Sequence, residues 1–440
     1  MAITGQKKDP AAMQTAAGYP EIKSMDTDLT FSIREKEALR TLGKRVAEIA
    51  ARPVMAQKAR LWTAHNDLKT DEPTVFADPE NGWNEIIPAK TLVTNDPLAR
   101  VWEMALLKQI YWADEIKDDK VIEAAFDVPY SYSNTGWGLQ TGVIGGENNG
   151  SYKIKQAIED YERDFDKLHH PQFIIDHEQS ERVLELAAEV FEGILNVRRK
   201  GTWWWSLGMT LDYIALRGLE DFMMDMVLEP DWVHRMMNLL CEGKLEMLNM
   251  LEREGLLPDN TGATYVGSGG FGYTEQLPQS GFSPHKVRTA DMWGFCESQE
   301  TVGCGPDLYE EFIFPYHNRI LERFGLNCYG CCEGYDDRWK VIKKLPRLRR
   351  ISVSPWSDWA TVPSFLGKDY IASVKLSPTP LATPKADEDT VRADARKAAR
   401  LTEGGIAEFI MKDNHTLGNN PRNLTRWVEI MREEIDGAFG

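Results

Sequence analysis

The stretch Gly325-Leu-Asn-Cys-Tyr-Gly-Cys-Cys-Glu-Gly-Tyr-Asp-Asp337 decides how the rest of the chain is interpreted. Its first part, Gly325–Cys332, predicts a strand that ends in thiols, and Asp337–Leu345 predicts the helix that follows. A strand, a short loop and a helix form one βα unit, which repeats in parallel sheets. Three of the six cysteines of the chain lie here beside a carboxylate, so the loop is also a candidate site for a soft metal ion.

Short apolar strands and helical segments alternate on both sides of this unit. Further strands are predicted at Pro73–Ala77, Lys120–Pro129, Ala290–Phe295, Leu348–Ser354, Tyr370–Lys375 and Ile406–Met411. The strands recur at intervals of roughly 30 to 45 residues, which indicates repeated βα units and a parallel sheet. About eight such units favour an α/β fold of the (β/α)8 TIM-barrel type over an open doubly wound sheet.

The chain of 440 residues is long enough for one large domain with insertions. We predict an N-terminal arm and helical extension over residues 1–66 and the barrel over residues 67–440. Met1–Asp28 is polar and lacks the apolar core of a signal peptide. It is expected to be an extended arm that could wrap a neighbouring copy, so a homodimer is a possible assembly.

Three other segments carry expectations. Ser131–Tyr152 is rich in Gly, Asn, Ser and Thr and predicts a long loop, whereas Gln179–Lys200 predicts a helix. Gly267–Gly272 is glycine-rich but does not match the dinucleotide-binding fingerprint. A Rossmann-type nucleotide site is therefore not expected.

Composition excludes several classes of partner. The formal net charge of -17 does not suit binding to nucleic-acid phosphates or to an anionic membrane surface. No apolar run approaches the roughly 20 residues that cross a bilayer. Six unevenly placed cysteines indicate reduced thiols and not a disulfide framework. A cytoplasmic enzyme acting on a small molecule is expected.

Reactive side chains follow several of the predicted strands. In a parallel barrel, functional groups lie where strands end and the βα loops begin. Such ends carry Glu297, the stretch Tyr329–Glu333, Asp358, and the stretch Asp413–His415. A barrel would bring these groups, which lie far apart in the sequence, to one face.

Strand alternation predicts which side chains of the opening stretch point into the barrel mouth. Asn327, Tyr329 and Cys331 share one face, and Cys328 and Cys332 lie on the other. If the polar face points inward, Cys331 is aimed at the site and Cys328 packs against a helix. Cys332 follows at the loop, where it could also turn inward.

A zinc site is one interpretation of these groups, because zinc accepts thiolate, imidazole and carboxylate ligands. The candidate ligands are Glu297, Cys331, Cys332, Asp413 and His415. The alternative is that the cysteines are buried structural thiols, a common role for free cysteine. The residue types alone leave both interpretations open.

From about Thr63 to Phe439, and most clearly from Asp291 onward, the chain resembles the uroporphyrinogen decarboxylase superfamily, within it the cobalamin-dependent methyltransferases. Pro306–Pro315 is similar to the helix that precedes the metal strand of that family, and Ile351–Asp358 fits its next strand. The arginine-rich N-terminal motif of the true decarboxylases has no match in this chain.

The resemblance also bears on the metal. Methyltransferases of this family bind zinc through a His-x-Cys pair, and Tyr329-Gly-Cys331 occupies that place, so Tyr329 stands where the histidine is expected. The stretch Lys412–His415 replaces the second zinc cysteine. The resemblance therefore implies zinc only if other members of the candidate set complete the site.

The resemblance implies a methyltransferase that demethylates a methoxylated, aromatic compound and passes the methyl group to cobalamin. A separate corrinoid carrier protein would hold the cobalamin, since the chain has no D-x-H-x-x-G motif. Zinc would polarise the ether oxygen as a Lewis acid. The candidate catalytic residues are Glu297, Tyr329 and Asp358, and the two carboxylic acids could instead protonate the leaving oxygen.

Trp293 and Trp356 are candidates for holding an aromatic substrate. One alternative function is a metal-free lyase or decarboxylase acting on a small carboxylated substrate. It would need convergent arginines, for which Arg338, Arg349 and Arg350 are the candidates. Another alternative is a binding protein without catalytic activity.

Overall fold

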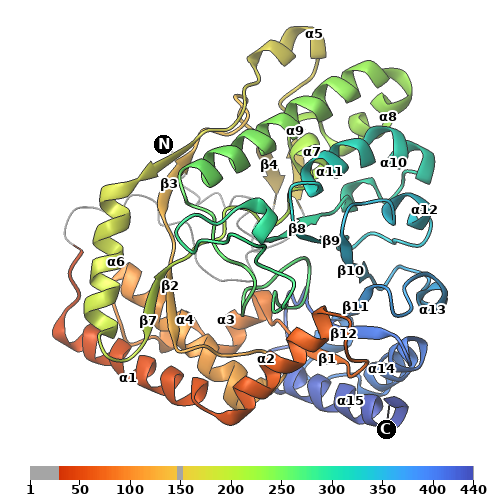
Figure 1. Ribbon diagram of the computed structural model, residues 1–440. Coiled ribbons are helices and arrows are strands. Elements are labelled where there is room, and N and C mark those ends of the chain that lie inside the picture. Colours follow the sequence, from red (N-terminus) through yellow and green to blue (C-terminus); the bar gives the residue numbers. More distant parts are fainter. Residues whose placement is uncertain (1–28, 146–151, 440) are drawn as a thin grey trace.

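The computed structural model describes residues 29–145 and 152–439, so the predicted arm Met1–Asp28 lies outside the described residues. Six parallel strands form one sheet in the order β1-β12-β11-β10-β9-β8, and their labels follow an arc in Figure 1. The strands are β1 (Thr74–Ala77), β8 (Trp293–Cys296), β9 (Leu326–Tyr329), β10 (Leu348–Val353), β11 (Ile371–Leu376) and β12 (Ile406–Met411). The predicted α/β class is confirmed.

Two more strands, β2 (Ala125–Val128) and β7 (Asn196–Arg199), pair in parallel with each other in a separate sheet. Within the described residues, no ladder of hydrogen bonds joins this pair to the six-stranded sheet. The closed eight-stranded barrel therefore stays a prediction.

Both edges of the six-stranded sheet are covered. At β1, the backbone N–H groups of Val75 and Ala77 donate to the carboxylates of Asp119 and Asp118 at 2.7 and 2.8 Å. At β8, the Asn260 side chain bonds both N–H and C=O of Trp293 at 3.0 Å. These side chains satisfy backbone groups that would otherwise stay unpaired at the two edges.

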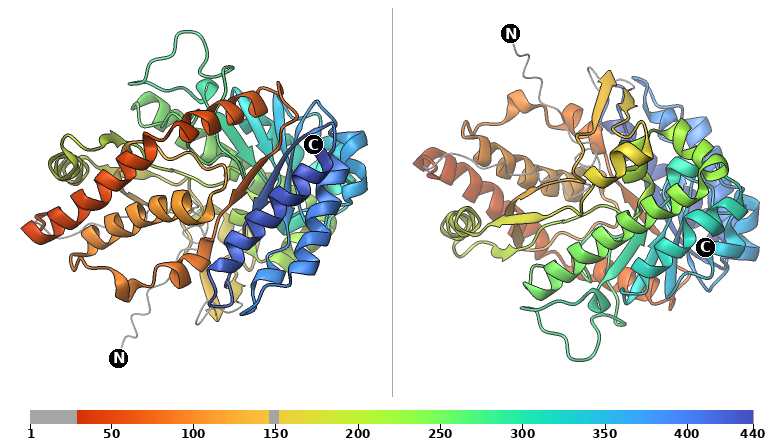
Figure 2. Two further views of the ribbon diagram at one scale, coloured as in Figure 1. Left: turned by 90° about the horizontal axis from the view of Figure 1, so that it is seen from below. Right: turned by 90° about the horizontal axis from the view of Figure 1, so that it is seen from above.

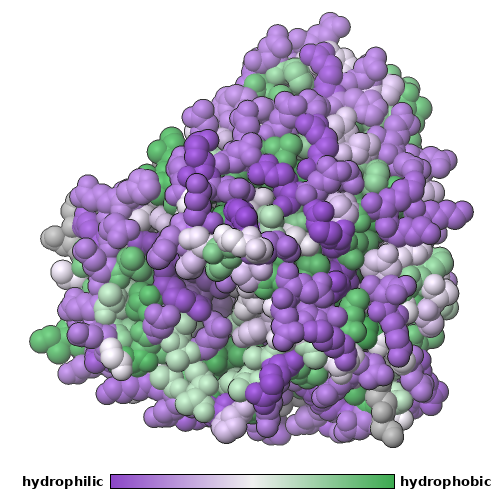
Figure 3. Space-filling model, viewed as in Figure 1, coloured by the Kyte–Doolittle hydropathy of each residue, from purple (hydrophilic) through white to green (hydrophobic). Residues whose placement is uncertain are grey.

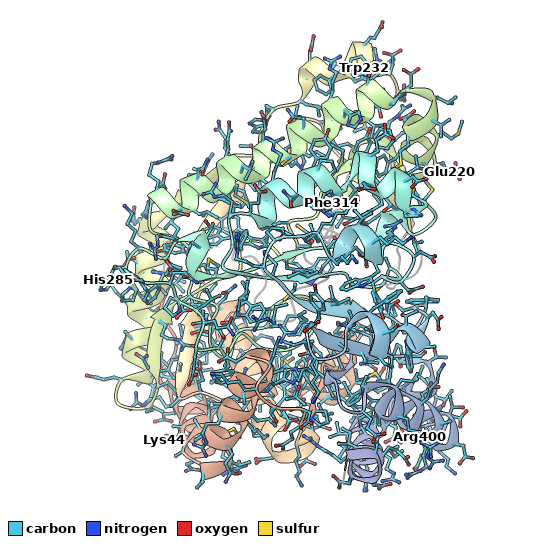
Figure 4. The ribbon with its side chains drawn as sticks, turned by 45° about the vertical axis from the view of Figure 1, so that its right-hand side comes forward. Lys44, Glu220, Trp232, His285, Phe314 and Arg400 are labelled. Atoms are coloured by element: carbon cyan, nitrogen blue, oxygen red, sulfur yellow. The ribbon has the colours of Figure 1, made fainter. Side chains whose placement is uncertain are left out.

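Helices cover the outer side of the sheet. Helices α14 (Glu388–Thr402) and α15 (Arg422–Phe439) pack on each other and contact β11 and β1, as Figure 2 shows. The N-terminal helices α1 (Ile33–Ala50) and α2 (Pro53–Asn66) are separate because Pro53 begins a new helix. Lys44 of α1 and Arg400 of α14 lie far from Glu220 of α8 (Leu219–Leu228) in Figure 4.

The surface in Figure 3 is mostly hydrophilic, in agreement with the high charged content of the chain. Among the described helices, none combines the length and the apolar character that a membrane crossing requires.

Two predictions about the central segment need correction. The predicted loop Ser131–Tyr152 contains β3 (Ser131–Asn134) and β4 (Gly142–Gly145), which pair antiparallel with β6 (Phe173–Asp176) and β5 (Tyr152–Lys155). The predicted helix over Gln179–Lys200 is also too long. Helix α6 (His177–Phe191) ends before Gly193, whose φ of +70° suits glycine, and β7 follows.

The glycine-rich segment Gly267–Gly272 packs into the concave face of the sheet as part of a short hairpin, in which Tyr265 and Phe271 form an antiparallel bridge. Its glycines leave no room for a side chain. A Cβ on Gly267 would meet Cys328 at 2.9 Å, and one on Gly269 would meet Ile410 at 2.9 Å. The glycines are thus explained by close packing inside the sheet.

Gly270→Ala is expected to destabilise the protein by about 2–4 kcal/mol, combining a left-handed backbone with overpacking. Gly270 has a φ of +86°, and its Cβ would meet Glu408 at 2.7 Å and Arg350 at 2.8 Å. Gly404→Ala is the matched control, because Gly404 has a φ of +72° but nothing within 4 Å of its Cβ. Urea unfolding measures both. Equal losses in the two variants would contradict the packing argument.

Candidate functional site

The carboxyl ends of the parallel strands meet at one edge of the sheet, which we call the carboxyl edge. It carries four groups from the strand ends: Asp78, Glu297 and Lys412 directly follow β1, β8 and β12, and Cys331 follows β9 after Gly330. All four side chains are at least nine-tenths buried. Parallel pairing therefore gathers acids, a thiol and an amine from distant parts of the sequence.

The alternation predicted for β9 is present, but its polar face points outward and not into the barrel mouth. Cys328 lies on the inner face, where its Sγ accepts a hydrogen bond from Arg350 at 3.5 Å. Asn327 faces the outer layer and donates to the backbone carbonyls of Leu321 and Pro346. Tyr329 likewise faces outward, with its ring centroid 6.1 Å from that of Tyr309.

Cys331 nevertheless reaches the inner side, because the strand ends before it. Gly330 has a φ of +88°, a conformation that interrupts the alternation of a strand. Cys331 Sγ then lies 3.5 Å from Lys412 Nζ and 3.6 Å from Cys332 Sγ. Cys331 thus turns inward through the backbone at Gly330 and not through strand alternation, and its place in a functional site stays a prediction.

Lys412 is held in this group by opposite charge. Its Nζ lies 3.4 Å from Asp413 Oδ1 in addition to its contact with Cys331. Burial lowers the pKa of Lys412, but the charges of Cys331, Tyr265 and Asp413 outweigh it and raise the pKa well above its usual value. The hydrogen bond to Cys332 and burial raise the pKa of the Cys331 thiol, against the effect of Lys412.

Glu297 is a buried carboxylic acid at the carboxyl edge, with 1 % of its surface exposed. Burial, followed by the charges of Glu300 and Glu333, raises the pKa of Glu297 well above its usual value. Its Oε2 accepts one hydrogen bond, from the backbone N–H of Gln299 at 3.1 Å. The environment thus favours the protonated form, which can donate a proton.

Glu333 fixes the two loops that carry Glu297 and Cys331. Its Oε1 accepts from the backbone N–H of Ser298 at 2.7 Å, and its Oε2 accepts from that of Cys331 at 2.8 Å. From the sequence, Glu333 is a loop residue that could turn inward together with Cys332. Its role as a clamp depends on the pairing of β8 with β9, which the sequence does not specify.

A second polar group lies deeper on the concave face. Arg350 Nε lies 3.0 Å from Glu408 Oε1, and both side chains are almost fully buried. Ser373 bonds Glu408, and Lys375 Nζ donates to Ser373 Oγ at 2.6 Å. Burial lowers the pKa of Lys375 to about 8. Lys375 and Glu408 sit within otherwise apolar strand sequences, a signal that could have identified them.

Several predicted site residues lie elsewhere. Tyr329 is buried against helices, and Asp358 is exposed and caps the turn that begins at Trp359 by accepting from Ala360 N–H at 3.1 Å. His415 is exposed, and only its backbone carbonyl is bonded, by Asn81. These three residues are therefore not brought together with Glu297.

The two predicted substrate-binding tryptophans do not lie together at the carboxyl edge. Trp293 is buried at the start of β8, where its Nε1 donates to Gly272 of the inserted hairpin at 3.0 Å. Trp356 lies in the loop after β10 and is 74 % exposed. Trp293 cannot contact a substrate there because the hairpin covers it.

The predicted zinc ligands do not form a ligand set as they are placed. In the part of the chain that the structure describes, no three His, Cys, Asp or Glu side chains are grouped so that they could hold a metal ion. Zinc requires three or four protein ligands. The Lys412 ammonium lies beside Cys331, where it would repel a cation.

Two surface cavities lie away from these residues. One, of about 420 Å³, lies between β6 and α9 (Pro230–Arg253), and the other, of about 470 Å³, lies beside α14. Neither is lined by Glu297, Cys331 or Lys412.

Comparisons with known proteins find likenesses among solved structures alone. No protein-family model matches the chain, and neither does any curated protein. Among solved structures, a methyltransferase from Methanosarcina mazei superposes with a TM-score of 0.47 at 12% sequence identity, covering 86% of this chain and 97% of that one. At this TM-score and identity, no argument about fold or activity rests on the match, and the superfamily resemblance stays a prediction.

Proposed function

We propose that the protein transfers a methyl group from a methoxylated compound to a corrinoid on a separate carrier protein, at the mouth of a (β/α)8 barrel. The observation that carries the proposal is Glu297, a buried acid whose surroundings favour its protonated form at the carboxyl edge. The sequence resemblance to corrinoid-dependent methyltransferases supports the same chemistry.

The chemical difficulty of O-demethylation is the leaving group. When the O–CH3 bond breaks, its electron pair stays on oxygen, and an unprotonated alkoxide or phenolate leaves poorly. The reduced corrinoid of the carrier supplies the nucleophile that accepts the methyl group. Glu297 would donate its proton to the departing oxygen, the task of a general acid. Glu333 keeps the Glu297 loop in place through its bond to Ser298.

An aromatic donor is supported by rings at the carboxyl end of β1. The Phe76 ring centroid lies 5.9 Å from that of Tyr265 and 4.9 Å from that of Phe271. Tyr265 remains partly exposed, and Lys412 is among the charges that act on its hydroxyl. Phe76 and Phe271 are buried, so Tyr265, which they support, is the ring that could meet an aromatic donor next to the thiol and amine group.

The alternative lyase finds less support, because its arginines are engaged. Arg338 donates to the backbone carbonyl of Cys304 at 2.8 Å, and Arg349 donates to that of Asn66 at 2.5 Å. Arg350 is paired with Glu408. These guanidinium groups do not converge on one point where a substrate carboxylate could bind.

The test is methyl transfer by the purified chain to free cob(I)alamin and to cob(I)alamin held by a corrinoid carrier protein. Methoxyarenes, methanol and methylamines serve as donors, and formation of methylcobalamin is followed by its absorbance. We expect turnover with one or more methoxyarenes, unchanged after dialysis against a zinc chelator. Failure of the whole donor panel with both acceptors would show that the proposed function is wrong.

A further inference from the structure

Cys331 and Cys332 form an isolated pair of neighbouring thiols, with their Sγ atoms 3.6 Å apart. We propose that this pair is a chelating site for monosubstituted trivalent arsenicals, compounds in which arsenic carries one carbon group and can bind two sulfurs. This inference does not depend on the proposed methyl transfer.

The donor count selects this class of ligand. No third His, Cys, Asp or Glu is grouped with the two thiols among the described residues, so a zinc ion would lack ligands. An organoarsenical brings its own third substituent and needs two thiols only. Arsenic is a soft acceptor, and it binds soft thiolates in preference to hard carboxylates.

The distance between the sulfurs fits the same geometry. Two metal–sulfur bonds of about 2.3 Å that meet near the tetrahedral angle place their sulfurs about 3.8 Å apart. Linear coordination with such bonds would need about 4.6 Å. The observed 3.6 Å therefore suits a bent S–As–S arrangement and not a linear two-coordinate ion.

Access favours reaction at this pair. Cys332 is partly exposed, whereas the other five cysteines are buried. Lys412 Nζ lies 3.5 Å from Cys331 Sγ and opposes in part the burial that raises the pKa of that thiol. The remaining thiols have no thiol partner in the described structure: Cys304, for example, contacts the sulfur of Met226 at 3.7 Å.

The reaction balances without an oxidant or reductant. Phenylarsine oxide exchanges its oxygen for two sulfurs, so that two As–S bonds form and both As–O bonds break. The two thiol protons leave with the oxygen as one molecule of water. Arsenic stays trivalent and no disulfide forms.

The test is titration of the full-length chain with phenylarsine oxide, followed by intact mass and by the number of thiols that still react with a chromogenic reagent under denaturing conditions. We expect one phenylarsenic group per chain and the loss of two reactive thiols. A dithiol should remove the group, whereas an equal concentration of a monothiol should not. Cys331→Ser and Cys332→Ser should each weaken binding by about 100-fold, since the second bond is intramolecular.

Cys304→Ser is the matched control, because it removes a buried cysteine outside the pair. It should bind phenylarsine oxide like the unaltered chain. Binding that survives in Cys332→Ser, or that a monothiol reverses as readily as a dithiol, would overturn the proposal. Circular dichroism of each variant separates lost chelation from lost folding.

Discussion

Glu297→Gln is expected to lower the rate of methyl transfer by about 10²- to 10⁴-fold, the usual contribution of a general acid. Glutamine has nearly the same shape but cannot donate an acidic proton. Because burial and two neighbouring carboxyl groups already favour a neutral Glu297, the neutral amide should be tolerated there. The variant should therefore fold normally and bind the donor, and the loss should appear in kcat and not in stability.

The dependence on pH has a definite sign. The pKa of Glu297 is raised, so the proton-donating form is present below that pKa and is lost as the pH rises through it. The unaltered enzyme should lose activity on the alkaline side, and the residual activity of Glu297→Gln should lack that limb. Stopped-flow absorbance of methylcobalamin formation across pH measures both profiles.

Asp358→Asn is the control for this prediction, since Asp358 was an equal candidate from sequence but lies exposed at a helical cap. It should keep nearly full activity. A donor with an electron-poor ring releases a phenolate that leaves readily without a proton. Glu297→Gln should therefore lower the rate of methyl transfer from such a donor by a smaller factor. An unimpaired Glu297→Gln variant, or an equal defect in Asp358→Asn, would contradict the assignment.

The sequence predicts the strands well where burial on both faces makes them continuously apolar. Ile406–Met411 is predicted with the bounds that β12 has, and all six of its residues are buried. Adjacent strands that run parallel also explain why Glu297 and Cys331 could be predicted at one edge. Both facts follow from local pattern and from the general geometry of βα units.

The interior arrangement could not be predicted in the same way. Asn327 suggested a polar face directed at the site, but its amide satisfies two backbone carbonyls of the outer layer. The hairpin around Gly270 fills the concave face with residues from outside the regular βα units, and no local pattern reveals that long-range contact. Lys412 carries no sequence signal of its own, because an ammonium is not a metal ligand and a single lysine is ordinarily exposed.

Arg350→Met is expected to destabilise the protein by about 3–5 kcal/mol, because it leaves a buried charge without its partner. Arg350 is 1 % exposed and bonds Glu408, Asn66 Oδ1 at 2.6 Å and Cys328 Sγ at 3.5 Å. Methionine keeps the apolar stem of the side chain and removes only the guanidinium. Urea unfolding at neutral pH, followed by tryptophan fluorescence, measures the loss.

The size of this loss should depend on pH through Glu408. Burial raises the pKa of Glu408, but the charges of Arg350 and His65 outweigh it and lower the pKa to about 2. In the unaltered protein, the stability that the Glu408 carboxylate contributes is fully present when the pH is above the ordinary pKa of glutamate. It is lost as the pH falls toward 2. Without Arg350, Glu408 takes up a proton more readily, so the deficit of the variant should narrow as the pH falls. The double variant Arg350→Met, Glu408→Gln should recover part of the stability at neutral pH.

Arg392→Met provides the comparison, because Arg392 pairs with Glu433 at 2.5 Å and with Glu434 at 2.8 Å near the surface, where the Arg392 side chain is 31 % exposed. Removing an exposed pair costs about 0.2–1 kcal/mol. The two arginine variants thus differ in burial of the pair and not in the chemistry removed. If Arg350→Met lowered the free energy of unfolding no more than Arg392→Met does, the ion pair of Arg350 with Glu408 would not be shielded from water as described. The hairpin that covers it would then have to leave a path for water.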